Sequence, residues 1–191
     1  MHFLIIIDHP HQNSFNHHML QRFTRGLKEE HSYDVLDLAQ EDFDPTMSEQ
    51  ELAGYGSGKF LDPKIEEYQQ LLLTCEHLVL IFPIWWLVMP ARLKGWLDKV
   101  LLPGFAFTTD QAPLPLLGHI RAASVLTTSG VTDAQLRREY HDTVEWVLCK
   151  GTLEFCGVGE CRWLNFGEVG FASQEKHARW LDYIEEYARD L

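Results

Sequence analysis

The stretch LVLIFPIWWLVMPARLKGWLDKVLLPGFAF, from Leu78 to Phe107, decides the fold of this chain. It begins with a continuous apolar run that stops at Pro83, and such a run is typical of a strand buried on both faces of a parallel sheet. A loop with two adjacent tryptophans follows, and Pro90 then opens a segment with helical composition. The stretch therefore predicts a buried strand, a special loop and a helix, in that order.

The same alternation of strand and helix runs along the whole chain. Apolar runs typical of strands span residues 2–7, 33–36, 78–82, 120–126 and 160–164. Helical spacing and end signals cover residues 15–30, 63–75, 91–101, 133–155 and 174–189, while 38–62 is a long acidic connection. Alternation of this kind forces parallel pairing with right-handed crossovers. We therefore expect an α/β fold with a three-layer, doubly wound, five-stranded parallel sheet, in a single domain over residues 1–191.

Composition and charge limit the classes of partner. The chain has 191 residues, 46% of them hydrophobic, which suits one domain with a full-sized core. Its 16 basic and 28 acidic side chains give a net charge of −12, which argues against binding to nucleic acid or to anionic lipid. No window approaches the ~18 uninterrupted apolar residues of a membrane span, and the start of the chain lacks the pattern of a signal peptide. We expect a cytoplasmic protein without an integral membrane segment.

The four cysteines show neither the spacing of a zinc or redox site nor the density of a disulfide scaffold. We expect Cys75, Cys149, Cys156 and Cys161 to be reduced and mostly buried. The loop after the first strand is rich in histidine, but no conventional ligand spacing is present, so no metal site is expected.

In a doubly wound sheet, ligands bind at the carboxyl ends of the strands. The candidate ligand-binding loops are therefore residues 8–16, 83–89 and 127–130. The first of these loops, DHPHQNSFN, lacks the glycines of a dinucleotide or P-loop motif. It offers His9, Gln12, Ser14 and Asn16 beside the positive end of a helix, a place for an anion such as a phosphate. Ordinary polar capping of the helix is the alternative interpretation.

The other two loops suit a flat ligand. Residues 83–87 can lay backbone polar groups along the edge of a planar heteroaromatic ring while aromatic side chains cover its face. The alternative is that both tryptophans plug the end of the sheet. The Thr127-Thr128-Ser129-Gly130 turn would let backbone approach a ligand closely, or it would simply start the next helix.

Together these motifs resemble the flavodoxin-like NAD(P)H:quinone oxidoreductases. The resemblance rests on motifs in the same order and spacing, namely His9-Pro10, Ser14-Phe15-Asn16, Phe82-Pro83-Ile84-Trp85-Trp86, Pro90-Ala91-Arg92-Leu93-Lys94-Gly95-Trp96, Gly104-Phe105-Ala106-Phe107 and Thr127-Thr128-Ser129-Gly130. It covers roughly residues 3–165, nearly the whole chain.

The resemblance implies a tightly bound flavin, FAD or FMN, and assigns residues to it. Those implied to hold the phosphate and ribityl end are His9, Ser14, Phe15 and Asn16, with Gln69 as a further contact. Those implied to line the isoalloxazine are Pro83, Ile84, Trp85, Trp86 and Leu87 on one side and Thr127, Thr128, Ser129 and Gly130 on the other. One indole would face the cofactor while its neighbour packs away. Ser129 departs from the family's usual glycine, and both flavins remain open.

The resemblance also implies a reaction. NAD(P)H would donate a hydride to the flavin, and a quinone or a similar flat electrophilic acceptor would then take it in a ping-pong mechanism. His141, with Tyr140 beside it, falls where family enzymes place a group near N1 and O2 of the flavin, and it would stabilise charge or donate a proton there. A histidine on the surface of a helix is the alternative.

A homodimer with the pocket at its interface is implied as well, with Ala112 to Leu117 contributing. A different function is implied by a second resemblance, in the same motifs, to the ancillary flavoprotein subunits of glutathione-gated potassium efflux systems. Those subunits regulate a transporter, whereas rapid turnover of quinones without a partner would mark an enzyme.

Overall fold

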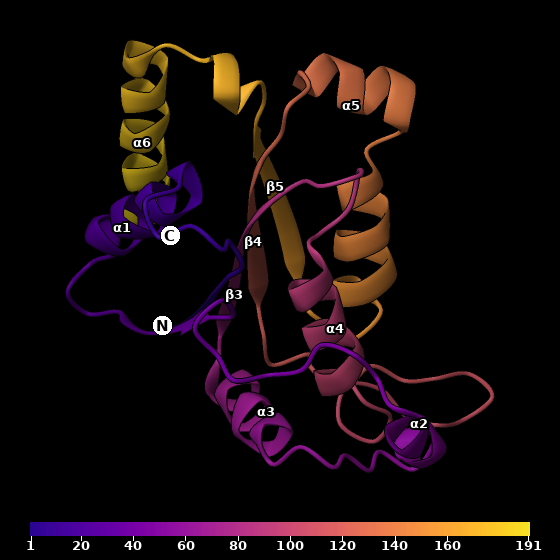
Figure 1. Cartoon of the computed structure of the whole chain (residues 1–191). Helices are drawn as coiled ribbons and strands as arrows, with labels where there is room; N and C mark the ends of the chain where they lie inside the picture. The colour runs from indigo at the N-terminus through magenta and orange to yellow at the C-terminus, as the bar shows by residue number, and fades with distance from the viewer.

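A five-stranded, wholly parallel sheet in the order β2-β1-β3-β4-β5 forms the centre of the computed structural model, which describes residues 1–191 (Figure 1). The strands are β1 (His2–Ile7), β2 (Ser32–Asp37), β3 (His77–Pro83), β4 (Ala122–Thr128) and β5 (Glu160–Phe166). This order is that of the flavodoxin-like doubly wound sheet. The predicted fold class is therefore confirmed.

Helices cover both faces of the sheet (Figure 1). One face carries α1 (Phe15–Gly26) and α6 (Gln174–Arg189), and the other carries α3 (Lys64–Thr74), α4 (Ala91–Val100) and η1 (Glu145–Glu154). The connections hold α2 (Glu49–Tyr55), α5 (Asp133–Tyr140) and the short η2 (Val169–Phe171). No helix is both long enough and apolar enough to span a bilayer.

The continuous apolar runs of the central strands follow from these two layers. Side chains alternate between the faces of a strand. Phe3 and Ile5 accordingly pack in a core cluster with α1 and α6, whereas Leu4 and Ile6 pack in a larger cluster with α3, α4 and η1. Both faces of β1 are buried, so every residue from Phe3 to Ile7 has to be apolar.

The first helix ends four residues earlier than predicted, because α1 stops at Gly26 rather than near Glu30. Gly26 faces the backbone of α6, where a Cβ atom would collide with the carbonyl oxygen of Glu185. The glycine thus permits the close packing of α1 on α6, and the chain turns to extended backbone at Leu27.

The helical region predicted over residues 133–155 is confirmed in part, because it is broken into two helices. α5 ends at Tyr140, and His141 and Asp142 adopt left-handed backbone angles, with φ of 54° and 49°. A helix with π-type hydrogen bonding, η1, follows from Glu145. No glycine or proline marks this break, so periodicity alone carries the helix through it.

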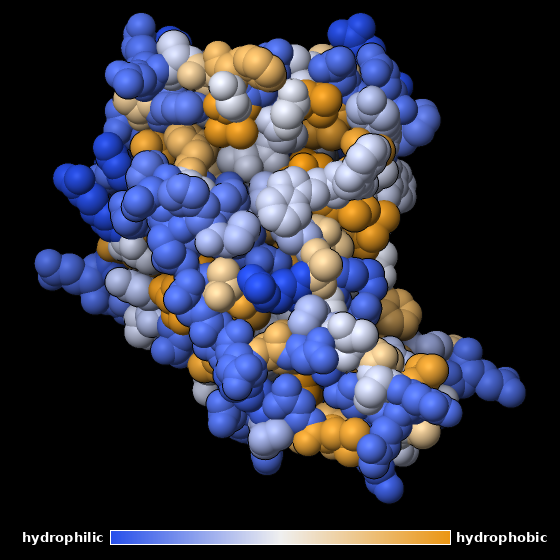
Figure 2. Space-filling model, in the orientation of Figure 1, coloured by the Kyte–Doolittle hydropathy of each residue, from blue (hydrophilic) through white to orange (hydrophobic).

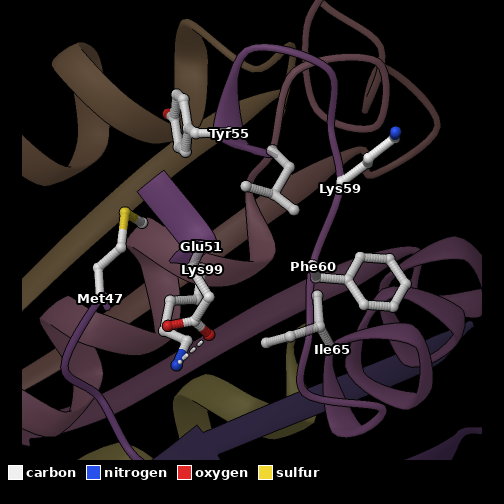
Figure 3. A pocket seen from close by; sticks show the side chains of 8 residues that line it. Met47, Glu51, Tyr55, Lys59, Phe60, Ile65 and Lys99 are labelled. Atoms are coloured by element: carbon white, nitrogen blue, oxygen red, sulfur yellow. Dashed lines mark ion pairs between the residues drawn. The ribbon is translucent and has the colours of Figure 1, made fainter. Parts of the chain in front are cut away.

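The connection from 38 to 62 holds a helix that was not predicted. α2 begins with a capping box in which Ser48 and Glu51 exchange side-chain and backbone hydrogen bonds. Glu51 also forms an ion pair of 2.8 Å with Lys99 of α4, drawn as a dashed line in Figure 3. The hollow in Figure 3 has a volume of about 10 Å³, which is room for no more than a single water. Its walls therefore anchor α2 and do not form a ligand site.

Two of the four cysteines are paired, which corrects the expectation of four reduced thiols. Cys149 of η1 and Cys161 of β5 form a disulfide, with Cα atoms 5.6 Å apart. They meet because η1 packs against β5. Cys75 and Cys156 are free and buried, as expected, and burial raises the pKa of each thiol to about 11.

Candidate functional site

Three loops meet at the carboxyl ends of β1, β3 and β4. The Asp8 N–H donates to Ile81 O at 3.0 Å, which ties the loop after β1 to β3. The Ile84 N–H donates to Thr128 O at 2.7 Å, which ties the loop after β3 to β4. The chain reverses its direction of strand addition between β1 and β3, and such a switch point is the usual ligand crevice of an open parallel sheet.

The loop after β1 is shaped by hydrogen bonds between its histidine rings and its own backbone. His9 Nδ1 accepts from the His11 N–H, and His11 Nδ1 accepts from the Asn13 N–H, both at 3.0 Å. Ser14 is the N-cap of α1, and its Oγ accepts from the His17 N–H at 3.3 Å. The N–H groups of Phe15 and Asn16 have no backbone acceptor, so they are open to an anion. No three His, Cys, Asp or Glu side chains are grouped to hold a metal ion.

Asn16 has an unsatisfied polar atom in the first turn of α1, beside this crevice. Its side chain lies in the first turn of α1 and is only 1% exposed. Its Oδ1 accepts from the Thr128 hydroxyl at 3.1 Å, but its Nδ2 has no partner. Leaving a buried amide donor unpaired costs about 1–3 kcal/mol. A ligand oxygen at this point would remove that cost.

The other predicted residue of this loop, Phe15, points elsewhere. Its ring centroid lies 4.7 Å from that of His177 and 5.9 Å from that of Trp180, both on α6. The Phe15 side chain therefore helps to hold α1 against α6, and only its backbone N–H belongs to the crevice.

The two adjacent tryptophans lie on a tight turn at the end of β3. Trp85 and Val88 exchange backbone hydrogen bonds of 3.0 and 3.2 Å, and the residues between them, Trp86 and Leu87, are left-handed with φ of 49° and 69°. Turns of this kind normally carry Asn or Gly. Bulky residues in this region cost about 1–3 kcal/mol each, and strain of this size clusters at functional sites.

Neither tryptophan packs into the core, contrary to the expectation that one indole packs away. Trp86 is 98% exposed at the tip of the turn, and Trp85 is 46% exposed with its ring centroid 6.3 Å from that of His9. The alternative that both indoles plug the end of the sheet is wrong as well. Both indoles are therefore exposed to a substantial degree at the carboxyl end of β3.

A hollow of about 250 Å³ opens beside this turn. Its lining comes from the loops after β3 and β4 and from α5, and consists of Ile84, Trp86, Leu87, Ser129, Gly130, Val131, Leu136 and Tyr140. Nothing lies within 4 Å of where a Cβ atom of Gly130 would stand, so the backbone there faces open space. The hollow is mainly apolar with a few hydroxyls, the composition that flat organic ligands favour.

The end of β4 is held by side-chain hydrogen bonds within the chain. Thr127 Oγ1 donates to Asn165 Oδ1 at 3.0 Å and accepts from Trp163 Nε1 at 2.8 Å. The Ser129 hydroxyl donates to Val131 O at 2.7 Å. These hydroxyls are committed to β5 and to the turn itself. They fix the backbone of residues 127–130 and leave it to provide the contacts to a ligand.

Tyr140 and His141, the two residues expected to act on the reaction, are separated by the end of α5. Tyr140 is half-buried and lines the hollow. His141 is the left-handed C-cap residue of α5, is exposed and is not part of the lining. The next residue but one, Thr143, donates its hydroxyl to Leu87 O at 2.6 Å. This bond links the strained end of α5 to the strained tryptophan turn.

Gln69 does not join the other predicted residues. It lies on α3, and its Nε2 donates to Val100 O at 3.0 Å, at the far end of α4 from the crevice. Within one chain, α4 starts at the carboxyl edge of the sheet and ends near the opposite edge, so Gln69 is remote from the three loops.

Asp8 was missed by the sequence analysis and joins two walls of the crevice. It is 2% exposed, and its Oδ2 accepts from the Leu93 N–H at 2.9 Å in the first turn of α4. Burial raises the pKa of Asp8, although the Leu93 hydrogen bond and the nearby Arg92 act in the opposite direction. Burial lowers the pKa of His9, the next residue. The position of Asp8, an acidic residue directly after an apolar strand, could have identified it as a residue of the site.

Known proteins similar to this chain share its fold, and several are named as NAD(P)H oxidoreductases. A family model described as flavodoxin-like fold matches residues 1–191. An uncharacterized NAD(P)H oxidoreductase of Escherichia coli is 32% identical over 187 residues, which cover 96% of this chain and 92% of that one. NAD(P)H dehydrogenase (quinone) 1 of Rattus norvegicus is 28% identical over 180 residues, which cover 81% of this chain but only 64% of that relative. The structure of an NAD(P)H:quinone oxidoreductase from Methanothermobacter marburgensis matches with a TM-score of 0.90 at 27% identity, over 100% of this chain and 96% of that one.

Proposed function

The chain belongs to the family of proteins with a flavodoxin-like fold, and from that premise we propose that it is a flavin-dependent NAD(P)H:quinone oxidoreductase. The observation that carries the proposal is the buried, unpaired Nδ2 of Asn16 where three loops meet, two of which border an apolar hollow. The similar proteins from rat and Methanothermobacter marburgensis, named as quinone-reducing enzymes, support the choice of acceptor.

The residues at the crevice fit a flavin. The phosphate end would meet the first N–H groups of α1, Ser14 and the amide of Asn16, with His9 close by. The isoalloxazine would lie against the backbone of residues 83–87 and 127–130. FMN and FAD both satisfy this arrangement. When bound, the flavin supplies the redox chemistry, because it accepts a hydride from NAD(P)H and delivers two electrons to the acceptor.

The order of events belongs to the same proposal. The flavin ring would occupy the hollow beside residues 83–87 and 127–130, and NAD(P)H and the quinone would stack on its open face in turn, which is a ping-pong mechanism. Parallel lines in double-reciprocal plots at several quinone concentrations would support this order, and intersecting lines would contradict it.

Of the two residues implied to assist the reaction, Tyr140 is the better placed. Its side chain lines the hollow, where its hydroxyl can donate a hydrogen bond to a reduced ring or acceptor. His141 is exposed, and reaching the hollow would need a change of backbone at the end of α5. Tyr140→Phe should therefore slow reduction by NAD(P)H about tenfold, the size of a lost hydrogen bond, whereas His141→Gln should leave it within twofold.

A homodimer would explain two further features. The chain exposes large apolar side chains on η1, at its C-cap and on the segment 109–116, including Trp146, Phe155 and Leu114. Figure 2 shows apolar atoms gathered on the side where Figure 1 places α5 and η1. Patches of this kind on a surface mark sites of association. Gln69 can reach a flavin only if a second copy brings its own loops against α3.

The test of the proposed function is the visible spectrum of the purified protein, after addition of FMN or FAD if it is colourless. Flavin bands that bleach on anaerobic addition of NADH or NADPH, and return when a quinone is added, would support the proposal. Protein that retains neither flavin would overturn it. Nothing in the structure favours the alternative of a regulatory subunit of a potassium efflux system, and turnover of quinone by the isolated protein would argue against it.

A further inference from the structure

Four hydrogen-bonded side chains connect the start of α1 and the loop before it to the end of β2. His17 Nε2 lies 3.2 Å from Asp37 Oδ2, and His17 Nδ1 lies 3.0 Å from Ser14 Oγ. Asp37 Oδ2 also accepts from Gln12 Nε2 at 2.8 Å. The His17 side chain is buried, so its two nitrogens meet these partners and little water.

The positions of the hydrogens follow from what each group can donate. A carboxylate only accepts, and both Asp37 oxygens are in use, because Oδ1 accepts from the Ala39 N–H at 3.0 Å. His17 Nε2 must therefore carry a hydrogen, and in a neutral ring Nδ1 is then bare. A bare Nδ1 accepts the only hydrogen of the Ser14 hydroxyl. In this state Ser14 has nothing to donate to a ligand.

The same place is built to receive an anion. The N–H groups in the first turn of the 12-residue helix α1 have no acceptors within the helix. The Asn16 side chain, 1% exposed, presents its unpaired Nδ2 from the same turn. A phosphate here would also draw the Ser14 hydroxyl as a donor, which the neutral ring of His17 prevents.

We propose that His17 takes up a proton when a phosphate group binds at the start of α1, so that phosphate and proton bind together. The added proton goes to Nδ1, which then donates to Ser14 Oγ, and the Ser14 hydroxyl is released to donate to the phosphate. Asp37 stabilises the resulting imidazolium through Nε2. This inference rests on the proposed function, because the flavin is what carries the phosphate.

Other titratable groups surround His17 and have to be separated from it. Asp37 faces it from β2, and His9 faces it from the loop after β1 with ring centroids 6.3 Å apart. Asp8, at the end of β1, interacts with Asp37. His9 is the competing site for the proton, since it lies in the same loop and is half-buried.

Calorimetry of flavin binding measures the proton directly. FAD and FMN are titrated into the protein at pH 8 in buffers of different ionisation enthalpy, and riboflavin, which has no phosphate, serves as the matched ligand. Histidines in general are neutral at pH 8, and the phosphate of FMN is already fully ionised there. We expect uptake of about one proton with FAD or FMN and none with riboflavin.

Variants assign the proton to its site. His17→Gln should abolish the uptake, because the amide cannot titrate, while His18→Gln, on the exposed face of the same helix, should retain it. His9→Gln should also retain it. In the wild type and His18→Gln, the Kd for FMN should rise with pH by at most about tenfold for each pH unit, and in His17→Gln it should stay flat.

The outcomes separate this inference from the proposed function. Flavin that binds with no proton uptake, or with uptake unchanged in His17→Gln, overturns the role of His17 and leaves the proposed function standing. Uptake that disappears in His9→Gln alone overturns it in favour of His9. A protein that binds no flavin at all overturns both.

Discussion

Two buried polar networks bridge the sheet to its helices, one at each end, and they differ in how well their groups are satisfied. Near the amino ends of the strands, His77 Nε2 bonds to the Ser124 hydroxyl and Ser124 bonds to the Tyr187 hydroxyl, both at 2.7 Å. None of these three side chains has a fully buried polar atom without a partner. Near the carboxyl ends, Asn16 bonds to Thr128 and its amide nitrogen remains unpaired.

This difference indicates that the satisfied network contributes to the stability of the fold and the unsatisfied one to ligand binding. A satisfied network in a dry interior stabilises one arrangement of sheet and helix, and here it holds α6 in place through Tyr187. An unsatisfied network lowers the stability of the free protein and returns that free energy when a ligand completes it. The left-handed Trp86 and Leu87 lie at the unsatisfied end as well. We expect substitutions at one end to change unfolding and substitutions at the other to change flavin affinity.

The largest effect should come from Ser124→Ala. The change leaves both His77 Nε2 and the Tyr187 hydroxyl buried without a partner, and each such group costs about 1–3 kcal/mol. We expect the free energy of unfolding in urea to fall by about 2–4 kcal/mol, with flavin affinity unchanged. Ser57→Ala, at an exposed serine, is the control and should change little. A loss of flavin affinity equal to that of the Asn16 variant below would erase the distinction between the two ends.

Asn16→Leu tests the other end. Leucine has a similar size but removes the unpaired donor, so the Kd for flavin should rise about 10- to 100-fold, the worth of a hydrogen bond to a charged group. The free energy of unfolding without flavin should change by less than about 1 kcal/mol, because a lost bond to Thr128 is offset by the removal of an unsatisfied amide. Fluorescence titration and urea unfolding of the same sample measure both quantities. Strong destabilisation without loss of affinity would show that Asn16 only supports the fold.

Acid should weaken the satisfied network. Burial lowers the pKa of His77 to about 4, from an ordinary value of 6.5. Between these values the unfolded chain holds a proton that the folded chain lacks, so stability falls as the pH drops from 6.5 towards 4. This histidine should contribute roughly 2 kcal/mol of loss between pH 6.5 and 5, at 1.36 kcal/mol per pH unit. In urea unfolding across this range, His77→Gln should show a shallower slope, and an equal slope would mean that His77 does not titrate as described.

The smallest effect is expected where an ion pair is exposed. Lys94 Nζ lies 2.6 Å from Asp98 Oδ1 on α4, and both side chains are about half exposed. Pairs of this kind contribute about 0.3–0.5 kcal/mol. Lys94→Ala should therefore alter neither unfolding nor flavin binding by more than about 0.5 kcal/mol. A larger loss of affinity for NADPH than for NADH in this variant would instead point to a contact with the 2′-phosphate.

The sequence predicts the sheet because the apolar pattern of a buried strand can be read from consecutive residues. Phe3 to Ile7 must be apolar in a strand buried on both faces, and that requirement is visible in the letters themselves. The loops after β1, β3 and β4 follow from topology, since parallel strands end at the same edge. Ser14, Asn16 and the tryptophan turn were found for this reason.

The features that were missed depend on pairings between distant residues or on local angles. The meeting of Cys149 with Cys161 and the bond from Gln69 to Val100 both need the packed structure. The helix breaks at His141, which has a left-handed backbone angle. No glycine lies at this point, so the sequence gives no indication of the break. By contrast, the capping box of Ser48 and Glu51 was legible in the sequence and was overlooked in a stretch taken as a loop.

Lys99 has one more consequence, which concerns how proteases would meet the folded chain. Its ammonium group donates to Asp44 O at 2.9 Å and pairs with Glu51, and its side chain is only 6% exposed. The segment 38–62 has the length and acidity of a linker that proteases cleave. The bonds from Lys99 to Asp44 and Glu51 hold the middle of this segment against α4. Residues 109–116 are all exposed, and no ion pair holds them to the rest of the chain. In a monomer, limited digestion should therefore nick the chain there first, whereas the proposed homodimer would cover that segment. In either state, Lys99→Met should open a cleavage region around α2.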